Sequence, residues 1–166
     1  MTTDRRLETV AYALLRAGFG AILWTHGWPK LLHEPHGSMG DPMAGSLHLI
    51  RDALHLPFAP LLAVLVMLLE TGGAVLLAAG AVTRLVALAF VGEMLGIGVA
   101  LGPTWPWIDR GIEYPVLMGL LAGYIAVRGG GPWSVDGLWT ARRRRDRARR
   151  AHGAPQLADR PVGRRE

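Results

Sequence analysis

A single carboxylate stands in the middle of the most apolar stretch of the chain. Between Phe58 and Thr83 the only charged residue is Glu70, and this run exceeds the ~20 residues that a helix needs to cross ~30 Å of hydrocarbon. A helix of a soluble protein is rarely apolar on every face. With 51% of its residues apolar and 19% charged, the chain is also richer in hydrocarbon than an ordinary soluble domain. The stretch therefore predicts a transmembrane helix over residues 58–82.

Three other apolar segments resemble this one less strongly. They cover residues 10–30, 84–102 and 112–128, and each contains or borders ionisable residues. We expect an all-α fold, an integral membrane four-helix transmembrane bundle that forms one domain over residues 10–140. A soluble four-helix bundle with a very apolar core is the alternative, and the uninterrupted second segment argues against it.

Loop charges predict the orientation of this bundle. If the first nine residues are cytoplasmic, then Arg5, Arg6, Arg84 and the arginine-rich carboxyl end all lie on the cytoplasmic side, as the positive-inside rule requires. Both the N and C termini are therefore predicted to be cytoplasmic.

The carboxyl-terminal residues 141–166 make the protein basic, because they hold ten arginines against three acidic residues. We expect a disordered, solvated cytoplasmic tail that fixes the orientation. Attraction to anionic lipid headgroups is the alternative role for the run RRRRDRARR. No nucleic-acid partner is expected.

The first outer connection, about residues 31–56, is long for a four-helix protein. Its apolar periodicity predicts a short surface helix at about residues 46–56. The connection carries four histidines, but HEPH at residues 33–36 lacks the four-residue spacing of the H-E-x-x-H zinc motif. We predict surface histidines and no metal site. The chain has no cysteine, so any redox role must use a bound cofactor or a partner.

Two pairs of glycines have the G-x-x-x-G spacing, Gly92 with Gly96 and Gly119 with Gly123. This spacing lets two helix backbones approach closely in a membrane. The same spacing suits helix packing within one chain and helix packing between the chains of a homo-oligomer. The sequence does not distinguish these two alternatives.

Ionisable groups inside the membrane are the strongest functional signal. A charge at the bilayer centre costs at least ~2.5 kcal/mol, so it normally faces the bundle interior, pairs with another group or takes up a proton. We predict a buried cluster of Arg16, Glu70 and Glu93 as the candidate catalytic site. One carboxyl is expected to hold a proton, because two carboxylates outnumber the single guanidinium.

A second group of ionisable residues is predicted near the outer ends of the helices. His26, Glu113 and Tyr114 are candidate contacts for a quinone headgroup, and an imidazole there could also pass protons. Interfacial pairing is the alternative for these residues. Snorkelling or interfacial pairing is expected of Lys30, Asp109 and Arg110.

Three motifs in register resemble the DoxX family. RAGFGAILWTHGWPKLL at residues 16–32 is similar to its first-helix pattern, and ETGGAVLLAAGAVTRLVAL at residues 70–88 to its second-helix pattern. GGGPWSVD at residues 129–136 resembles the G-x-G-x-x-S-x-D that follows helix 4. The matching positions are Arg16, Gly27, Lys30, Glu70, Gly73, Gly80, Arg84, Gly129, Gly131, Ser134 and Asp136.

The resemblance implies a multi-pass protein of a bacterial inner (plasma) membrane. Some members of the family are subunits of quinone-linked oxidoreductases that act on sulfur compounds or in oxidative stress. A non-autonomous subunit of such a complex, with partner subunits that supply electrons, is thus the first functional hypothesis. A non-catalytic membrane anchor or assembly protein and a small proton-coupled transporter are the alternatives.

Overall fold

The computed structural model describes residues 3–153, and every regular element in that range is a helix. Two of them, η1 and η2, are π-helical, and η3 is a 3-10 helix. In chain order the elements are α1 (Thr3–Leu32), α2 (Pro42–His48), η1 (Leu49–Ala53), α3 (Ala59–Leu68), η2 (Leu69–Gly73), α4 (Ala74–Ala79), α5 (Thr83–Leu101), η3 (Trp107–Asp109), α6 (Glu113–Arg128) and α7 (Val135–Gly153).

Three helical units are long and apolar enough to cross a membrane: α1, the continuous unit Ala59–Ala79 and α5. Their outward faces are apolar as well, with Leu61 59% and Val99 74% exposed, and α6 turns Leu120 outward at 70% exposure. Hydrocarbon solvates such faces, whereas water would not. The chain is therefore a helical membrane protein with several candidate spans.

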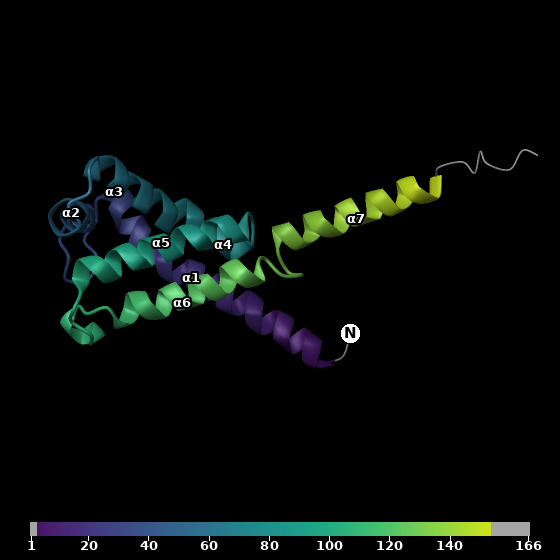
Figure 1. Cartoon of the computed structure of the whole chain (residues 1–166), viewed down its shortest axis with the longest axis horizontal. Coiled ribbons are helices and arrows are strands. Elements are labelled where there is room, and N and C mark those ends of the chain that lie inside the picture. Colours follow the sequence, from purple (N-terminus) through teal and green to yellow (C-terminus); the bar gives the residue numbers. More distant parts are fainter. Residues whose placement is uncertain (1–2, 154–166) are drawn as a thin grey trace, which may run out of the picture.

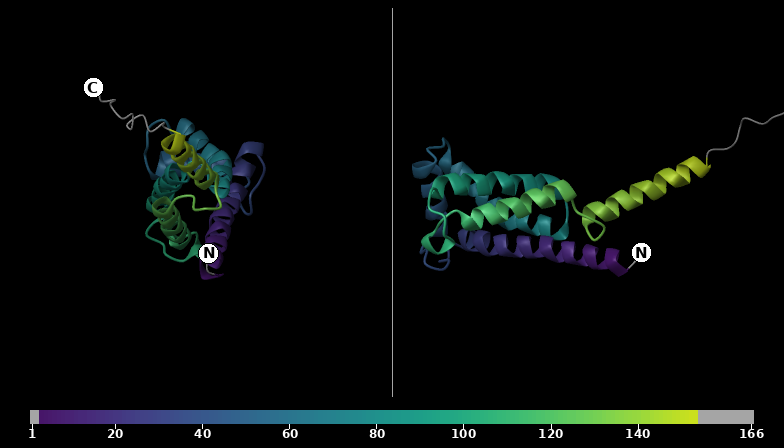
Figure 2. Two further views of the ribbon diagram at one scale, coloured as in Figure 1. Left: turned by 90° about the vertical axis from the view of Figure 1, so that its right-hand side faces the viewer. Right: turned by 60° about the horizontal axis from the view of Figure 1, so that its bottom comes forward.

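The long helices lie side by side as one bundle, and α7 leaves it at one end (Figures 1 and 2). The short helices α2 and η1 and the connection around η3 lie at the opposite end (Figure 1). The beginning of α1 lies at the same end as the beginning of α7 (Figure 2). We call the end with α2 the loop end and the end with α7 the tail end.

The core joins α1, α4, α5 and α6. Phe19 and Phe90 are buried and meet edge to face, with ring centroids 5.6 Å apart. Around them lie Leu23, Leu77 and Ile125, each at most 2% exposed. Edge-to-face packing of this kind is favourable beyond the area that it buries.

Small residues set the register of α1 against the antiparallel unit α3–η2–α4. A Cβ atom built on Gly20 would lie 2.6 Å from the carbonyl oxygen of Ala74, and one built on Gly27 would lie 2.6 Å from the carbonyl carbon of Glu70. Only glycine allows the two backbones to come this close. This register places Glu70 beside the last turns of α1.

The glycine-rich connection after α6 is fixed by its own motif. The Ser134 hydroxyl donates to the carbonyl of Gly131 and accepts from the backbone N–H of Gly137, at 2.6 and 2.9 Å. The Asp136 carboxylate reaches the start of α5, where it accepts hydrogen bonds from the backbone N–H groups of Val82 and Thr83, each at 2.9 Å. A residue of α7 thus caps α5.

Three boundaries differ from the sequence-based expectation. The helix predicted at residues 58–82 is not regular, because η2 interrupts it at the level of Glu70. The surface helix predicted at 46–56 begins earlier, at Pro42, where proline suits the first turn and Asp41 caps it. The tail predicted to be disordered from residue 141 is helical to Gly153, within α7. The rest of the predicted tail lies outside the described residues.

Candidate functional site

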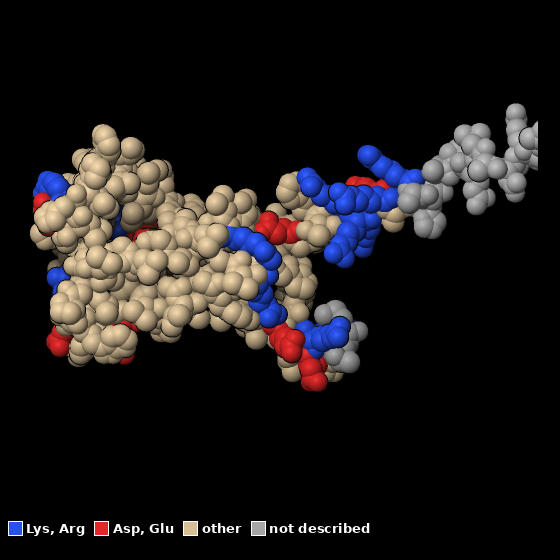
Figure 3. Space-filling model, in the orientation of Figure 1, with Lys and Arg blue, Asp and Glu red and all other residues tan. Residues whose placement is uncertain are grey.

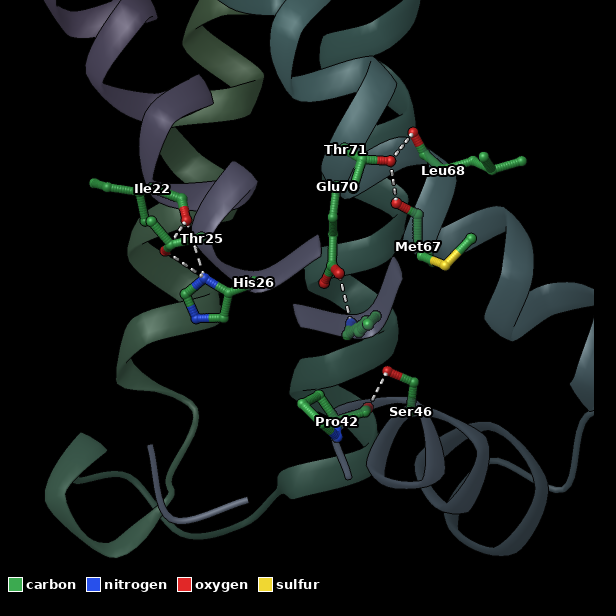
Figure 4. A network of polar contacts seen from close by, with 10 residues as sticks. Ile22, Thr25, His26, Pro42, Ser46, Met67, Leu68, Glu70 and Thr71 are labelled. Carbon is green, nitrogen blue, oxygen red and sulfur yellow. Dashed lines mark hydrogen bonds and ion pairs between the residues drawn. The ribbon is translucent and has the colours of Figure 1, made fainter. Parts of the chain in front are cut away.

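Glu70 has a partner, and it is a lysine. The Lys30 ammonium donates to a Glu70 carboxylate oxygen at 2.5 Å, and the two side chains are 9% and 5% exposed (Figure 4). A charge in an apolar interior is tolerated when it is paired in this way. The pair joins the last turn of α1 to η2.

Gly27 and η2 create the space for this pair. Gly27 lies one turn before Lys30 on the same face of α1, and its missing side chain lets α1 lie against Glu70 and Thr71. The Thr71 hydroxyl donates to the carbonyl of Met67 at 2.7 Å (Figure 4). π-helical turns often lie at functional sites, because they change the direction in which side chains leave a helix.

A large cavity lies next to the ion pair at the loop end. Its volume is about 1200 Å³, and its walls come from α1, α2, η1, the α3–η2 unit, α5 and the start of α6. Most of the lining is apolar, and both Lys30 and Glu70 belong to it. Large apolar pockets with a few polar groups are typical binding sites for small molecules.

One face of α5 explains why this cavity exists. Ala89, Gly92, Gly96 and Ala100 recur at helical spacing, and all of them line the cavity. A Cβ atom on Gly92 would meet nothing within 4 Å, so this glycine faces open space rather than another helix. Among the α5 residues that line the cavity, Glu93 carries the ionisable side chain.

Glu93 extends into the site next to the carboxyl of Glu70. Both of its carboxylate oxygens are buried, and neither forms a hydrogen bond with the described residues. Its carboxyl lies within electrostatic range of Glu70 and Lys30. Since Lys30 is already paired with Glu70, the site holds one more carboxyl than ammonium group.

Tyr114 and His26 form the neighbouring part of the wall. The Tyr114 hydroxyl is buried and has no hydrogen-bond partner among the described residues. Its ring stacks on His26 at a centroid distance of 6.0 Å, and the His26 ring also meets His36 at 5.1 Å. His26 Nδ1 donates to the carbonyl of Ile22 at 3.0 Å, which fixes the ring (Figure 4).

These groups suit a ligand with a polar head and a hydrocarbon body. A carboxyl group can donate a hydrogen bond when it is protonated and accept one when it is ionised, and a phenol can do either. Buried polar atoms are nearly always satisfied in folded proteins. The carboxyl of Glu93 and the hydroxyl of Tyr114 are therefore placed to contact a polar group within the cavity.

The predicted pairing of Arg16 with the carboxyls is wrong. Arg16 is 3% exposed and donates to backbone carbonyls at the tail end, those of Ala78, Gly130 and Trp133. It lies 14 positions before Lys30 on α1, which corresponds to about 21 Å along a helix. The antiparallel register thus brings Lys30, and not Arg16, to Glu70.

The structure places two of the three predicted headgroup contacts at the cavity. His26 and Tyr114 line the cavity, whereas Glu113 is exposed and is not part of the lining. Lys30, predicted to be an interfacial charge, is instead buried in the site. The signal for Lys30 was present in the sequence, because Gly27 and Lys30 lie three residues apart and therefore on one helical face.

No metal centre is formed by the residues described. In residues 3–153 no three His, Asp or Glu side chains gather closely enough to hold an ion. His48 instead pairs with Asp52 at 2.8 Å. Hydrogen bonds from Arg51 and His48 lower the pKa of Asp52 to about 2.

Comparisons with known proteins agree with this architecture. The DoxX family model matches residues 11–103, more than half of the chain, and the matched stretch includes Lys30, Glu70 and Glu93. The connection at residues 129–136 lies beyond it. No curated protein and no solved structure matches the chain. The family model covers more than half of the chain, and three helical units are apolar enough to span a bilayer. The chain therefore belongs to the DoxX family of membrane proteins.

Proposed function

We propose that this protein is the membrane subunit of a quinone-linked oxidoreductase, and that the cavity at the loop end holds the quinone headgroup. One observation carries the proposal. Among the described residues, the two Glu93 oxygens and the Tyr114 hydroxyl have no geometrically defined hydrogen bond, although they are buried in the wall of a largely apolar cavity. A quinone offers carbonyl oxygens to these groups and a hydrocarbon tail to the apolar walls.

The residues have separate roles in this proposal. Glu93 exchanges a proton with the ligand, Tyr114 positions a carbonyl oxygen, and the Lys30–Glu70 pair holds α1 against η2. A bound quinone supplies redox chemistry that couples electron uptake to proton uptake. Electrons come from a partner subunit, because the chain contains no redox-active cysteine.

The proposal includes four membrane crossings with both termini in the cytoplasm of a bacterial cell. The fourth crossing is α6, whose 16 residues extend about 24 Å. An even number of crossings agrees with α1 and α7 beginning at the same end. Since the chain has no native cysteine, cysteines introduced as Gly40→Cys and Asp146→Cys should react with an impermeant reagent from opposite sides of the membrane. Labelling of both from one side would contradict the topology.

The function is tested on protein purified from its own membranes in mild detergent. Native mass spectrometry should detect a bound quinone in the wild type and its loss in Glu93→Gln and Tyr114→Phe, with the fold intact by circular dichroism. Glu113→Gln is the matched control, because Glu113 is a carboxylate outside the cavity lining. It should retain the quinone.

Two results would contradict the proposal. Equal quinone retention in Glu93→Gln and the wild type would remove Glu93 from the site. A wild-type protein that carries no quinone and no partner subunit would favour the membrane-anchor role. The buried Lys30–Glu70 pair favours that second candidate, because it joins two helices whether or not a ligand binds.

A further inference from the structure

A second hollow lies at the tail end of the bundle, far from the cavity. It is an open groove of about 650 Å³ between the start of α5, the end of α6, the glycines that follow α6 and the first turns of α7. Three arginines line it, one from each helix: Arg84, Arg128 and Arg144. All three are exposed, and none forms an ion pair with a carboxylate of residues 3–153.

Neighbouring groups hold two of these arginines in place. Gly129 has φ +75°, and a Cβ atom there would lie 3.1 Å from Arg84 Nε, so the Arg84 side chain lies directly across this glycine. The Arg128 guanidinium stacks over the ring of Tyr12 at 4.5 Å and donates to the Tyr124 hydroxyl at 3.0 Å. The positive charges are thus positioned at the groove rather than spread over the surface.

Among the described residues, Asp136 is the one carboxylate that lines the groove, and it is already hydrogen-bonded. Asp136 accepts hydrogen bonds from the backbone of Val82 and from the backbone and hydroxyl of Thr83. The groove is lined by three guanidinium groups and one carboxylate, so its net charge is positive. Figure 3 shows that basic side chains also cover α7, beside this end of the bundle.

The groove lies at one end of a candidate membrane span, where lipid headgroups are expected. Arg84 is in the first turn of α5, a candidate membrane span. Beside the groove, Leu85 and Val127 are 67% and 80% exposed, so an apolar surface begins where the arginines end. Trp133 and Trp139 are exposed at the same end, as expected for aromatic residues at a membrane interface.

We propose that this groove binds the phosphate headgroup of an anionic phospholipid of the bilayer. Guanidinium groups match phosphate oxygens in geometry and charge. The apolar surface that continues from the groove accommodates acyl chains, which a soluble phosphate lacks. This site is separate from the cavity at the loop end, and its occupancy does not depend on the proposed redox role.

The test uses the full-length protein in nanodiscs that contain phosphatidylglycerol and phosphatidylcholine. Native mass spectrometry after release in mild detergent counts the phosphatidylglycerol molecules that each variant retains. The groove variant is Arg84→Gln/Arg144→Gln, which spares Arg128 and its contact with Tyr12. The matched control is Arg147→Gln/Arg150→Gln. It also removes two positive charges, but from residues of α7 that do not line the groove.

The wild type and the control should both prefer phosphatidylglycerol, and the groove variant should lose roughly tenfold or more of that preference. Equal losses in the two variants would show a general charge attraction and overturn the site. Displacement of the lipid by an equal concentration of inorganic phosphate would assign the groove to a soluble anion and also overturn the proposal. If the groove variant does not fold, Arg144→Gln is compared with Arg147→Gln, with the same outcomes.

Discussion

At the scale of single residues, Lys30 is what makes Glu70 tolerable in an apolar segment. The two side chains are buried and form an ion pair at 2.5 Å. Removing one partner of a buried pair leaves a charge without compensation, whereas replacing both by apolar residues is often nearly neutral. The pair therefore gives a clear prediction for a mutant cycle.

Lys30→Met should lower the free energy of unfolding by about 3–5 kcal/mol, because Glu70 then remains buried without its cation. Lys30→Met/Glu70→Leu should recover most of this loss. The measurement is reversible unfolding in mixed detergent micelles, with helicity as the signal. Additive effects of the two substitutions would show that the groups are not coupled in the protein.

Gly27 gives a second prediction at this scale. Gly27→Ala should destabilise the bundle, because the new Cβ atom would lie 2.6 Å from the backbone of Glu70 and push α1 away from η2. Gly18→Ala is the matched control on the same helix, since a Cβ atom there meets nothing within 4 Å. It should be neutral or stabilising, as alanine favours a helix by up to about 1 kcal/mol over glycine. Thermal unfolding that ranks the two variants in the opposite order would contradict the close approach of α1 to η2.

At the scale of elements, α5 depends on α7 for its cap. Val82 precedes α5 in the left-handed region, with φ 48°, and its own side chain offers no hydrogen bond. Asp136 supplies the missing acceptors from the far end of the chain. This contact explains why the aspartate of GGGPWSVD follows the serine at that spacing, since Ser134 caps α7 and Asp136 caps α5.

Asp136→Asn should cost about 1 kcal/mol of stability, the usual net contribution of a hydrogen bond. Both carboxylate oxygens of Asp136 accept hydrogen bonds at the start of α5, and an asparagine keeps only one acceptor oxygen. Burial alone would raise the pKa of Asp136, but hydrogen bonds from Thr83 and Val82 and the nearby Arg16 hold it below its usual value. The stabilisation by Asp136 is therefore complete above the ordinary aspartate pKa and is lost as the pH falls through the lower folded value.

Unfolding midpoints of the wild type and Asp136→Asn, measured from neutral to acidic pH, check this sign. The difference between the two proteins should shrink as the medium becomes acidic. A difference that grows toward acidic pH would show that the carboxylate is not the group that caps α5.

The sequence predicts long apolar helices well and irregular ones poorly. Hydropathy locates α1 and α5, because a helix that crosses hydrocarbon needs a long apolar run. The apolar stretch at residues 112–128 likewise coincides with the helix α6. Hydropathy does not reveal η2, because a π-helical turn has no signature in composition. The helical continuation of α7 is hidden for another reason: its arginines suggest a solvated chain, although arginine is also a good helix former.

At the scale of the whole molecule, the antiparallel register decides which charges meet. The sequence alone marks Glu70, Glu93, His26 and Tyr114 as unusual, since ionisable and polar groups within apolar spans are costly. The cation predicted for the two carboxyls, Arg16, is wrong, because the depth of a residue in the membrane does not fix the register between two neighbouring helices. The helices α2 and η1 complete the cavity that gathers these four side chains, and no local pattern predicts their position over the bundle.

The central claim is that this cavity holds a quinone headgroup, and photoaffinity labelling tests it most directly. The protein in its native membranes is irradiated with an azido-quinone, and the labelled peptides are mapped by mass spectrometry. We expect label on the α5 segment around Glu93 and at the start of α6 around Tyr114, suppressed by excess unlabelled quinone and absent in Glu93→Gln. Label spread over the lipid-facing surface, unaffected by competition or by the substitution, would contradict the account.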